Sequence, residues 1–458
     1  MEDRMKRGTL ALGLLSIFML SLRPVYAQEQ KPAPQQTPAQ PEQKPAEPAE
    51  KPLGPGWLSL DCCVGLIDKW IADNKAKVQD FLGIGISGYI DTGWTWATTH
   101  PGSPASISGR IFDKDYNSVQ FNDFNVTLDK PEKDWGVGFH ISADFGRTGA
   151  LLGDNTAWGP VFTTTNGVSV ANVRLEPSAQ LRESYITTTI PVGEGIGVKG
   201  GLFVTPLGTE IIPIPGTYND NISRSFLFNF AIPLRHLGTL FSYPVWKKDK
   251  DTTIVNATAG IVTGWDDPRD NNTSPSFLGG VAVTPSDTIQ YASNIIAGEE
   301  PTFVGPNTHP KRSTPRLAWS NVWTFKPIDP LGLSFEYTYG HQTRASLITG
   351  HSSATWQGVA GIASWTWTDR VITAFRAEWF NDRNGARLGG ANGGTGPANV
   401  NVGEVTFTGS YKFTKMLMGR AEVRQDFSDQ PVFLTGRAAN GNFSFNQTTL
   451  ALQVLYQY

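Results

Sequence analysis

Cysteine and histidine are scarce in this chain of 458 residues, and their scarcity excludes much site chemistry. The two cysteines are adjacent, at Cys62 and Cys63. With no histidine beside them they make a poor metal site, and in an oxidising compartment they would bridge to another chain or pair with each other only under strain. The six histidines are scattered, and none falls in a G-x-S-x-G or H-E-x-x-H motif. The sequence therefore predicts no enzyme, no catalytic or metal site and no cofactor.

Long apolar runs are missing after residue 27, although a transmembrane helix needs about 20 apolar residues. This absence excludes a helical membrane protein. Charged residues make up 17% of the chain and the net charge is −3, so nothing indicates a nucleic-acid partner.

Three short segments precede the main part of the chain. Residues 1–27 combine a basic start, an apolar run and a small residue at the end, which is typical of a cleaved secretory signal peptide. Residues 28–56 contain eight prolines among polar residues and alanine, and are predicted to be a disordered linker. Residues 57–82 carry apolar residues at mostly helical spacing, which predicts a short amphipathic periplasmic helix.

Residues 135–145 alternate strictly between apolar and polar side chains. The odd positions are all apolar: Trp135, Val137, Phe139, Ile141, Ala143 and Phe145. Successive side chains of a strand point to opposite faces, so one face of this strand is wholly apolar. In a soluble sandwich that face would meet a second sheet, whereas in an outer-membrane barrel it would meet lipid.

The connections between the alternating runs favour the barrel. Seven short polar turns, such as Lys247–Asp251 and Pro327–Pro330, alternate with eight long segments rich in Gly, Asn, Pro and Thr. Fifteen connections join sixteen strands, and bacterial outer-membrane barrels have an even strand number with short periplasmic turns and long outer loops. We therefore expect residues 83–458 to form an all-β, transmembrane antiparallel barrel with both ends periplasmic and no convincing helix after Gly83.

A family resemblance rests on three segments between residues 183 and 233. Glu183-Ser-Tyr185, Gly200-Gly-Leu-Phe-Val-Thr-Pro-Leu-Gly208 and Asn221-Ile-Ser-Arg-Ser-Phe-Leu-Phe-Asn-Phe-Ala-Ile-Pro233 resemble the OmpL-like beta-barrel porins, the type 2 porin family. The resemblance covers about residues 83–458. It implies an outer-membrane channel, and no catalytic motif can be carried over.

Charged residues at alternate positions mark one inward face. Arg420, Glu422, Arg424 and Asp426 alternate with apolar residues, and nearby runs supply Arg376, Glu378, Glu404 and Lys412. Charge rings of this kind select ions and solutes in channels, which makes these eight residues pore-lining candidates. The alternative is a salt-bridge ladder that stiffens the wall.

The segment near 206–234, between the fifth and sixth strands, is unusually apolar for an outer loop. One interpretation is that it folds into the lumen and narrows the pore, which would place Glu210, Asp220 and Arg224 at the constriction. The other is that residues 226–232 simply begin the sixth strand.

These patterns predict a Gram-negative outer-membrane porin that passes small hydrophilic solutes or ions by passive diffusion. The expected partners are outer-membrane lipid and lipopolysaccharide, the barrel-assembly machinery acting on a C-terminal strand that ends in Tyr458, and possible further copies of the chain. The alternative is a barrel with a filled lumen that serves binding, adhesion or hydrophobic-solute transport. The inward faces are mostly polar, which counts against an apolar solute.

Overall fold

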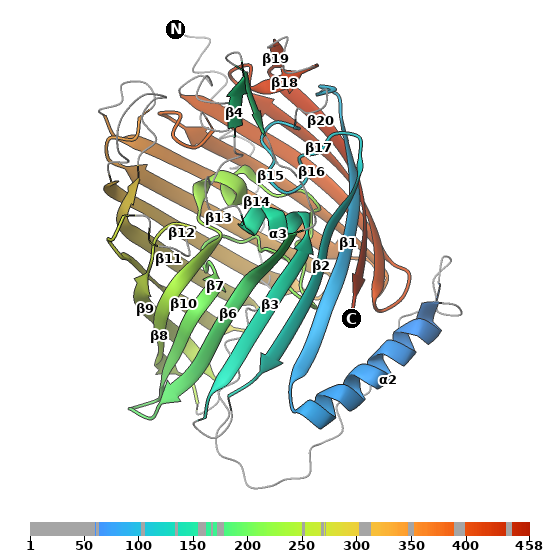
Figure 1. Cartoon of the computed structure of the whole chain (residues 1–458), viewed down its shortest axis with the longest axis vertical. Coiled ribbons are helices and arrows are strands. Elements are labelled where there is room, and N and C mark those ends of the chain that lie inside the picture. The colour runs from blue at the N-terminus through green and yellow to red at the C-terminus, as the bar shows by residue number, and fades with distance from the viewer. Residues whose placement is uncertain are drawn as a thin grey trace.

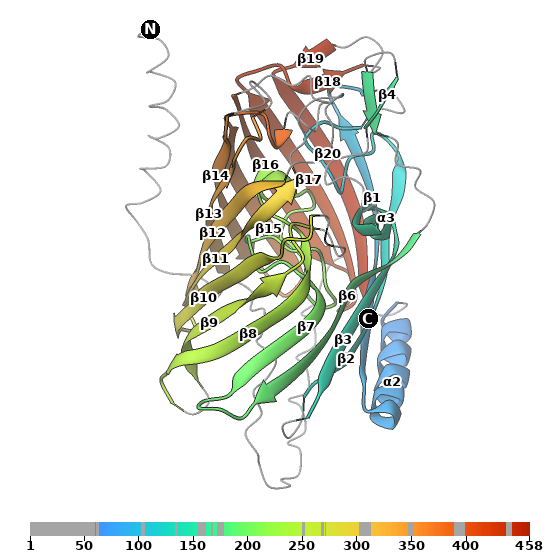
Figure 2. The same ribbon diagram turned by 60° about the vertical axis from the view of Figure 1, so that its left-hand side comes forward.

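Alternating side chains along the main part of the chain build a closed antiparallel barrel of sixteen strands (Figures 1 and 2). The computed structural model describes residue 60 and residues 64–458 except 102–105, 133–135, 154–161, 166–167, 172–177, 250–251, 267–269, 271, 302–312, 347–351, 389–398 and 437–441. The predicted signal peptide and linker lie outside these residues.

The barrel strands follow one another around the wall in chain order, and the last pairs with the first. They are β1 (Gly85–Ala97), β2 (Val119–Lys130), β3 (Gly138–Gly146), β6 (Ser178–Ile190), β7 (Ile196–Val204), β8 (Arg235–Lys247), β9 (Thr253–Val262), β10 (Ser276–Ser286), β11 (Ile289–Pro301), β12 (Ser313–Ile328), β13 (Leu331–Gln342), β14 (Ala354–Thr366), β15 (Val371–Asp382), β16 (Val400–Lys412), β17 (Leu417–Ser428) and β20 (Asn446–Gln457).

The strand count and the alternation of short and long connections are confirmed. The seven short turns lie at one end of the barrel, the short-turn end, and the eight longer connections lie at the other, the long-loop end. Two small hairpins lie in long connections, namely β4 (Phe162–Thr165) with β5 (Val168–Ala171) and β18 (Phe433–Thr435) with β19 (Asn442–Ser444).

Three helical segments accompany the barrel in the part of the chain that the structure describes. Helix α2 (Val64–Leu82) precedes β1, as the spacing of its apolar residues predicted. The expectation of no helix after Gly83 was wrong, because α3 (Arg147–Gly153) and the single π-helical turn η1 (Leu227–Ala231) lie in connections between strands. Within the described part of the chain, no helix combines the length and apolar character needed to cross a membrane.

The faces of β17 match the sequence pattern. Arg424 and Asp426 are fully buried inside the barrel, whereas Val423 and Phe427 are 42% and 43% exposed on its outer surface. Strand β6 departs from simple alternation, because the register of the β3–β6 pair shifts between Ser142 and Ala143. A bulge of this kind turns consecutive side chains to one side, and Arg182 and Glu183 are both buried in the lumen.

An apolar core lies inside the barrel, and this corrects the expectation of mostly polar inward faces for part of the wall, from β8 to β15. Inward positions on β8 to β15 include Leu240, Leu278, Ile296, Trp356 and Phe380, all buried in one cluster. They pack against apolar side chains of the segment 206–234, which would otherwise be exposed to water. Polar and charged inward faces dominate on β15 to β17 and on β1, β2, β3 and β6.

Candidate constriction site

The connection between β7 and β8, residues 205–234 and here called the constriction loop, runs inside the barrel. Its direction reverses at a turn where Ile214 and Thr217 exchange backbone hydrogen bonds of 3.2 and 2.9 Å. Pro215 and Gly216 occupy the turn centre, and Gly216 has a φ of +81°. Proline followed by a residue with positive φ is the signature of a type II turn, so the sequence itself fixes this reversal.

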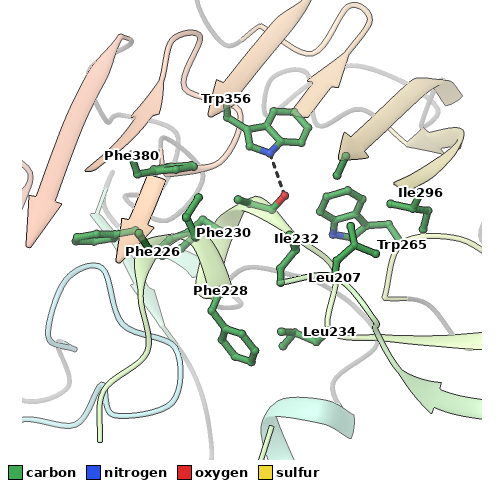
Figure 3. Close-up of a cluster of buried hydrophobic side chains, with 14 of the residues drawn as sticks. Leu207, Phe226, Phe228, Phe230, Ile232, Leu234, Trp265, Ile296, Trp356 and Phe380 are labelled. Carbon is green, nitrogen blue, oxygen red and sulfur yellow. Dashed lines mark hydrogen bonds between the residues drawn. The ribbon is translucent and has the colours of Figure 1, made fainter. Parts of the chain in front are cut away.

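The returning arm of the loop carries the aromatic residues that fill the lumen (Figure 3). Phe226, Phe228 and Phe230 lie on or beside η1, and each is at most 5% exposed. Trp356, which projects inward from β14, donates a 3.0 Å hydrogen bond from its indole nitrogen to the carbonyl oxygen of Ala231. The loop is therefore packed as a protein core rather than as a surface loop.

Two wall carboxylates bind the backbone of the returning arm, the part of the loop after the turn at residues 214–217. Glu378 on β15 accepts hydrogen bonds from the backbone nitrogens of Phe226 at 2.6 Å and Leu227 at 2.5 Å, where η1 begins. Glu422 on β17 accepts from those of Ile222 at 2.5 Å and Ser223 at 3.0 Å. The first amides of a helical turn have no partner within the turn, so Glu378 satisfies donors that would otherwise be buried unpaired, and Glu422 does the same for two amides in the bend before the turn.

Three wall arginines bind the loop from the same side. Arg420 donates to the carbonyl oxygens of Asn219 and Asp220 at 2.7 and 2.6 Å. Arg424 donates to the carbonyl oxygen of Arg224 at 2.6 Å.

Arg376, the third of these arginines, binds the loop and also belongs to an ion-pair network. It donates to the carbonyl oxygen of Ser223 at 2.7 Å and forms salt bridges with Glu210 at 2.7 Å and Glu404 at 2.6 Å. The side chains of Arg376 and Glu404 are fully buried. The charged ladder therefore holds the loop in place, in addition to lining the wall.

The candidate loop residues all lie in the lumen. Glu210 pairs with Arg376 and accepts a 2.7 Å hydrogen bond from the backbone nitrogen of Ser225. The guanidinium of Arg224 lies 5.7 Å from the ring centre of Phe112 and 5.9 Å from that of Phe228, and burial lowers its pKa. Burial likewise raises the pKa of Asp220.

The structure groups seven of the eight wall candidates around the loop. Asp426 pairs with Arg424 at 2.6 Å and with Arg110 of the β1–β2 connection at 3.0 Å. Lys412 lies apart, at the short-turn end of β16, where it pairs in register with Met418. Among the described residues, no group of three or more His, Cys, Asp and Glu side chains could hold a metal ion.

The comparisons with known proteins agree with this architecture. The family model described as "Putative beta-barrel porin-2, OmpL-like" matches residues 83–458, which is most of the chain. The chain belongs to this porin family. No curated protein sequence matches it.

Solved outer-membrane proteins share the fold of this porin at low sequence identity. The outer membrane channel DcaP of Acinetobacter baumannii is 10% identical with a TM-score of 0.52, over 82% of this chain and 97% of that one. A loop-deletion mutant of OmpT of Vibrio cholerae is 10% identical with a TM-score of 0.51, over 82% and 99%. An anion-selective porin from Comamonas acidovorans is 11% identical with a TM-score of 0.50, over 82% and 99%. At these identities the likeness shows the fold alone.

A second group of wall side chains that binds the loop of this porin was not predicted from the sequence. The hydroxyl of Tyr89 on β1 shares its one proton between two acceptors, Asp123 on β2 at 2.7 Å and the carbonyl oxygen of Pro213 at 3.0 Å. Arg182 on β6 also binds that carbonyl and pairs with Asp123 and Asp144. The bulge in β6 hid this site, because it breaks the alternation from which inward residues are read.

Stacked side chains hold the loop from the long-loop end. The guanidinium groups of Arg316 and Arg387 both stack on Trp265, at 5.1 and 5.0 Å from its ring centre. Arg387 also lies 5.4 Å from the ring of Trp356 and donates a hydrogen bond to the carbonyl oxygen of Phe230. Burial lowers the pKa of Arg387 to about 10. These residues come from two connections and two strands that are far apart in the chain, so no local sequence pattern joins them.

The wall also contacts the first part of the loop, before the turn at residues 214–217. Asn294 on β11 donates to the carbonyl oxygen of Pro206 at 2.8 Å, and the backbone nitrogen of Gly208 donates to Ser320 on β12 at 3.0 Å. The backbone nitrogen of Thr209 donates to Glu336 on β13 at 2.8 Å. The loop of this porin thus contacts the wall from β11 to β17 and again at β1 and β6.

Proposed function

We propose that this outer-membrane porin is a narrow channel in which the constriction loop limits passive diffusion to small hydrophilic solutes and ions. The observation that carries the proposal is the set of hydrogen bonds from opposite walls to one loop inside the barrel. A barrel of sixteen strands is wide enough to leave an aqueous channel, so a loop fixed across it reduces that opening.

The inward face beyond the loop, toward the short-turn end, supports a hydrophilic path. Asn256, Thr258, Gln290 and Ser334 occupy inward positions there and are partly exposed. Uncharged polar side chains of this kind can exchange hydrogen bonds with passing water and solutes. The charged side chains that bind the loop would then set whether the constriction prefers cations or anions.

Export, assembly and partners follow from the same proposal. Residues 1–27 would direct secretion, the outer apolar band would contact lipid, and lipopolysaccharide would surround the long-loop end. The barrel-assembly machinery would act on the C-terminal strand β20, and further copies of the chain are possible partners. The short-turn end would face the periplasm.

The apolar core in the lumen favours one alternative, a barrel with a filled lumen that binds or adheres rather than conducts. Swelling of liposomes that contain the folded protein separates the two functions. We expect swelling in solutions of small sugars, at rates that fall steeply as the sugar grows. If correctly folded barrels give no swelling with any sugar or amino acid, the channel proposal is wrong and the filled-lumen alternative is favoured.

A further inference from the structure

Helix α2 lies against the outside of the barrel along its short-turn end (Figures 1 and 2). Three contacts place it there. The backbone nitrogen of Leu60, just before the helix, donates to the carbonyl oxygen of Phe413 in the β16–β17 turn at 3.3 Å. The hydroxyl of Tyr456 near the end of β20 donates to Asp68 at 2.9 Å, and Gln79 donates to the carbonyl oxygen of Ile86 at the start of β1 at 3.0 Å.

These contacts make α2 follow the rim of the barrel. Phe413, Tyr456 and Ile86 all belong to the short-turn end of neighbouring strands. The helix therefore spans the seam where β20 closes onto β1, and it is attached near its beginning, at Asp68 and near its end. A helix held in this way runs around the barrel wall instead of projecting from it.

One side of α2, beside its line of contact with the barrel, carries a wide apolar sector that is interrupted by Asn74 and Lys77. Phe81 is 88% exposed, Leu66 70%, Trp70 67% and Ile67 56%. At 100° per residue these four, together with Val78, fall within about a third of the helix circumference. An exposed apolar patch of this kind marks a surface that binds something apolar.

Most of the polar residues of α2 lie on its other two sides. Asp68, Lys75 and Gln79 lie toward the barrel and are partly or wholly buried. Lys69 and Asp73 form an exposed i,i+4 salt bridge of 2.6 Å on the third side. The apolar and charged sides thus flank the line of contact with the wall, so one can face the membrane while the other faces water.

We propose that α2 is an interfacial helix that binds the phospholipids of the periplasmic leaflet of the outer membrane through Leu66, Ile67, Trp70 and Phe81. The inference rests on the proposed orientation of the barrel, with its short-turn end in the periplasm. Phospholipid is the occupant because the apolar side continues the outer apolar surface of the barrel. Leu452 and Val454, on the strand that contacts Asp68, are 55% and 50% exposed on that surface.

The residue types fit the depth at which such a helix would lie. Aromatic residues favour the lipid–water interface, and Tyr411 and Phe413 form an edge-to-face ring pair at 5.2 Å beside the contact with Leu60. A helix with one apolar and one charged side lies in the plane of the interface with its apolar side among the acyl chains. Exposed Lys77, on the apolar side, can extend its ammonium to the headgroups while its methylene stem stays in contact with lipid.

Site-directed fluorescence on the full chain in phospholipid vesicles tests the proposal. In a background with Cys62→Ser and Cys63→Ser, the variants Ile67→Cys and Phe81→Cys place an environment-sensitive label on the apolar side. The matched control Asp73→Cys places it on the charged side. We expect lipids with spin-labelled acyl chains to quench the first two labels at least about twofold more than the third, and aqueous iodide to do the reverse.

Each other outcome contradicts the membrane assignment in a distinct way. Equal iodide quenching on both sides would mean that α2 projects its apolar side into water. Shielding from both quenchers, with excimer formation between pyrene labels on separate chains, would identify a second copy of this chain as the occupant. Heat-modifiable mobility confirms folded barrels, and sugar swelling of the same vesicles reports channel function separately. Loss of swelling with normal lipid quenching would reject the porin proposal and leave the lipid contact intact.

Discussion

Glu378 and Glu422 hold the returning arm of the constriction loop, and replacing both by glutamine should release it. Each carboxylate accepts two backbone hydrogen bonds from the loop, to Phe226 and Leu227 and to Ile222 and Ser223. A glutamine side chain keeps one acceptor oxygen and places an amide donor against the second backbone N–H. The loop would therefore lose charge-assisted bonds and gain a donor–donor contact at each site.

The size of the effect follows from these four bonds. A hydrogen bond to a charged group contributes about 1.5–3 kcal/mol, so loss of even one bond at each site weakens loop docking by about 3 kcal/mol or more. A change of that size multiplies the ratio of released to docked loops by about 100-fold. We expect single-channel recordings of the double variant to show a larger mean conductance and added current noise.

Limited proteolysis gives a second measurement of the same release. Arg224 is buried in the lumen, so trypsin should not reach the Arg224–Ser225 bond while the loop is docked. The double variant should become sensitive to cleavage there. Glu194→Gln is the matched control, because Glu194 lies in the β6–β7 turn, pairs with Lys247 at 2.8 Å and does not touch the loop. A folded double variant with unchanged conductance, noise and trypsin resistance would refute the claim that Glu378 and Glu422 hold the loop.

Three further predictions concern charge, topology and closure. Arg420→Gln removes a positive charge at the constriction, so reversal potentials under a salt gradient should move toward cation preference and the shift should weaken at high salt; an unchanged potential would leave Arg420 as a structural contact only. Labels placed at residues 247–251 should react only after the outer membrane is permeabilised, because this turn lies at the short-turn end; reaction on intact cells would reverse the orientation. Deleting residues 450–458 removes most of β20 and leaves the edges of β1 and β17 unpaired, so the heat-modifiable barrel should be lost from the outer membrane; normal levels of it would contradict this role of the strand.

The barrel was predictable because the sequence patterns that specify its strands and turns are local. Period-two alternation assigns each residue to one face, and turn length assigns each connection to one end, so sixteen strands follow without any long-range contact. The inward positions of Arg420 and Arg424 follow for the same reason, since the opposite face of β17 carries only apolar or small residues apart from Gln425.

The position of the loop was not predictable from the same information. Phe226, Phe228 and Phe230 alternate as they would in a strand, yet they lie on or beside η1. Hydrogen bonds from Glu378 and Trp356 to the loop backbone stabilise this conformation, and both residues are more than 100 positions away in sequence. The apolar inward residues Leu278 and Ile296 were missed for a related reason, because their partners are in the loop rather than on neighbouring strands.

Single-channel conductance of the purified, folded protein in planar bilayers tests the central claim most directly. An aqueous path past the docked loop predicts discrete current steps that are smaller than those of the Glu378→Gln, Glu422→Gln variant. Folded wild-type barrels that insert and carry no ionic current would contradict it, because a lumen closed by the loop cannot serve as a porin.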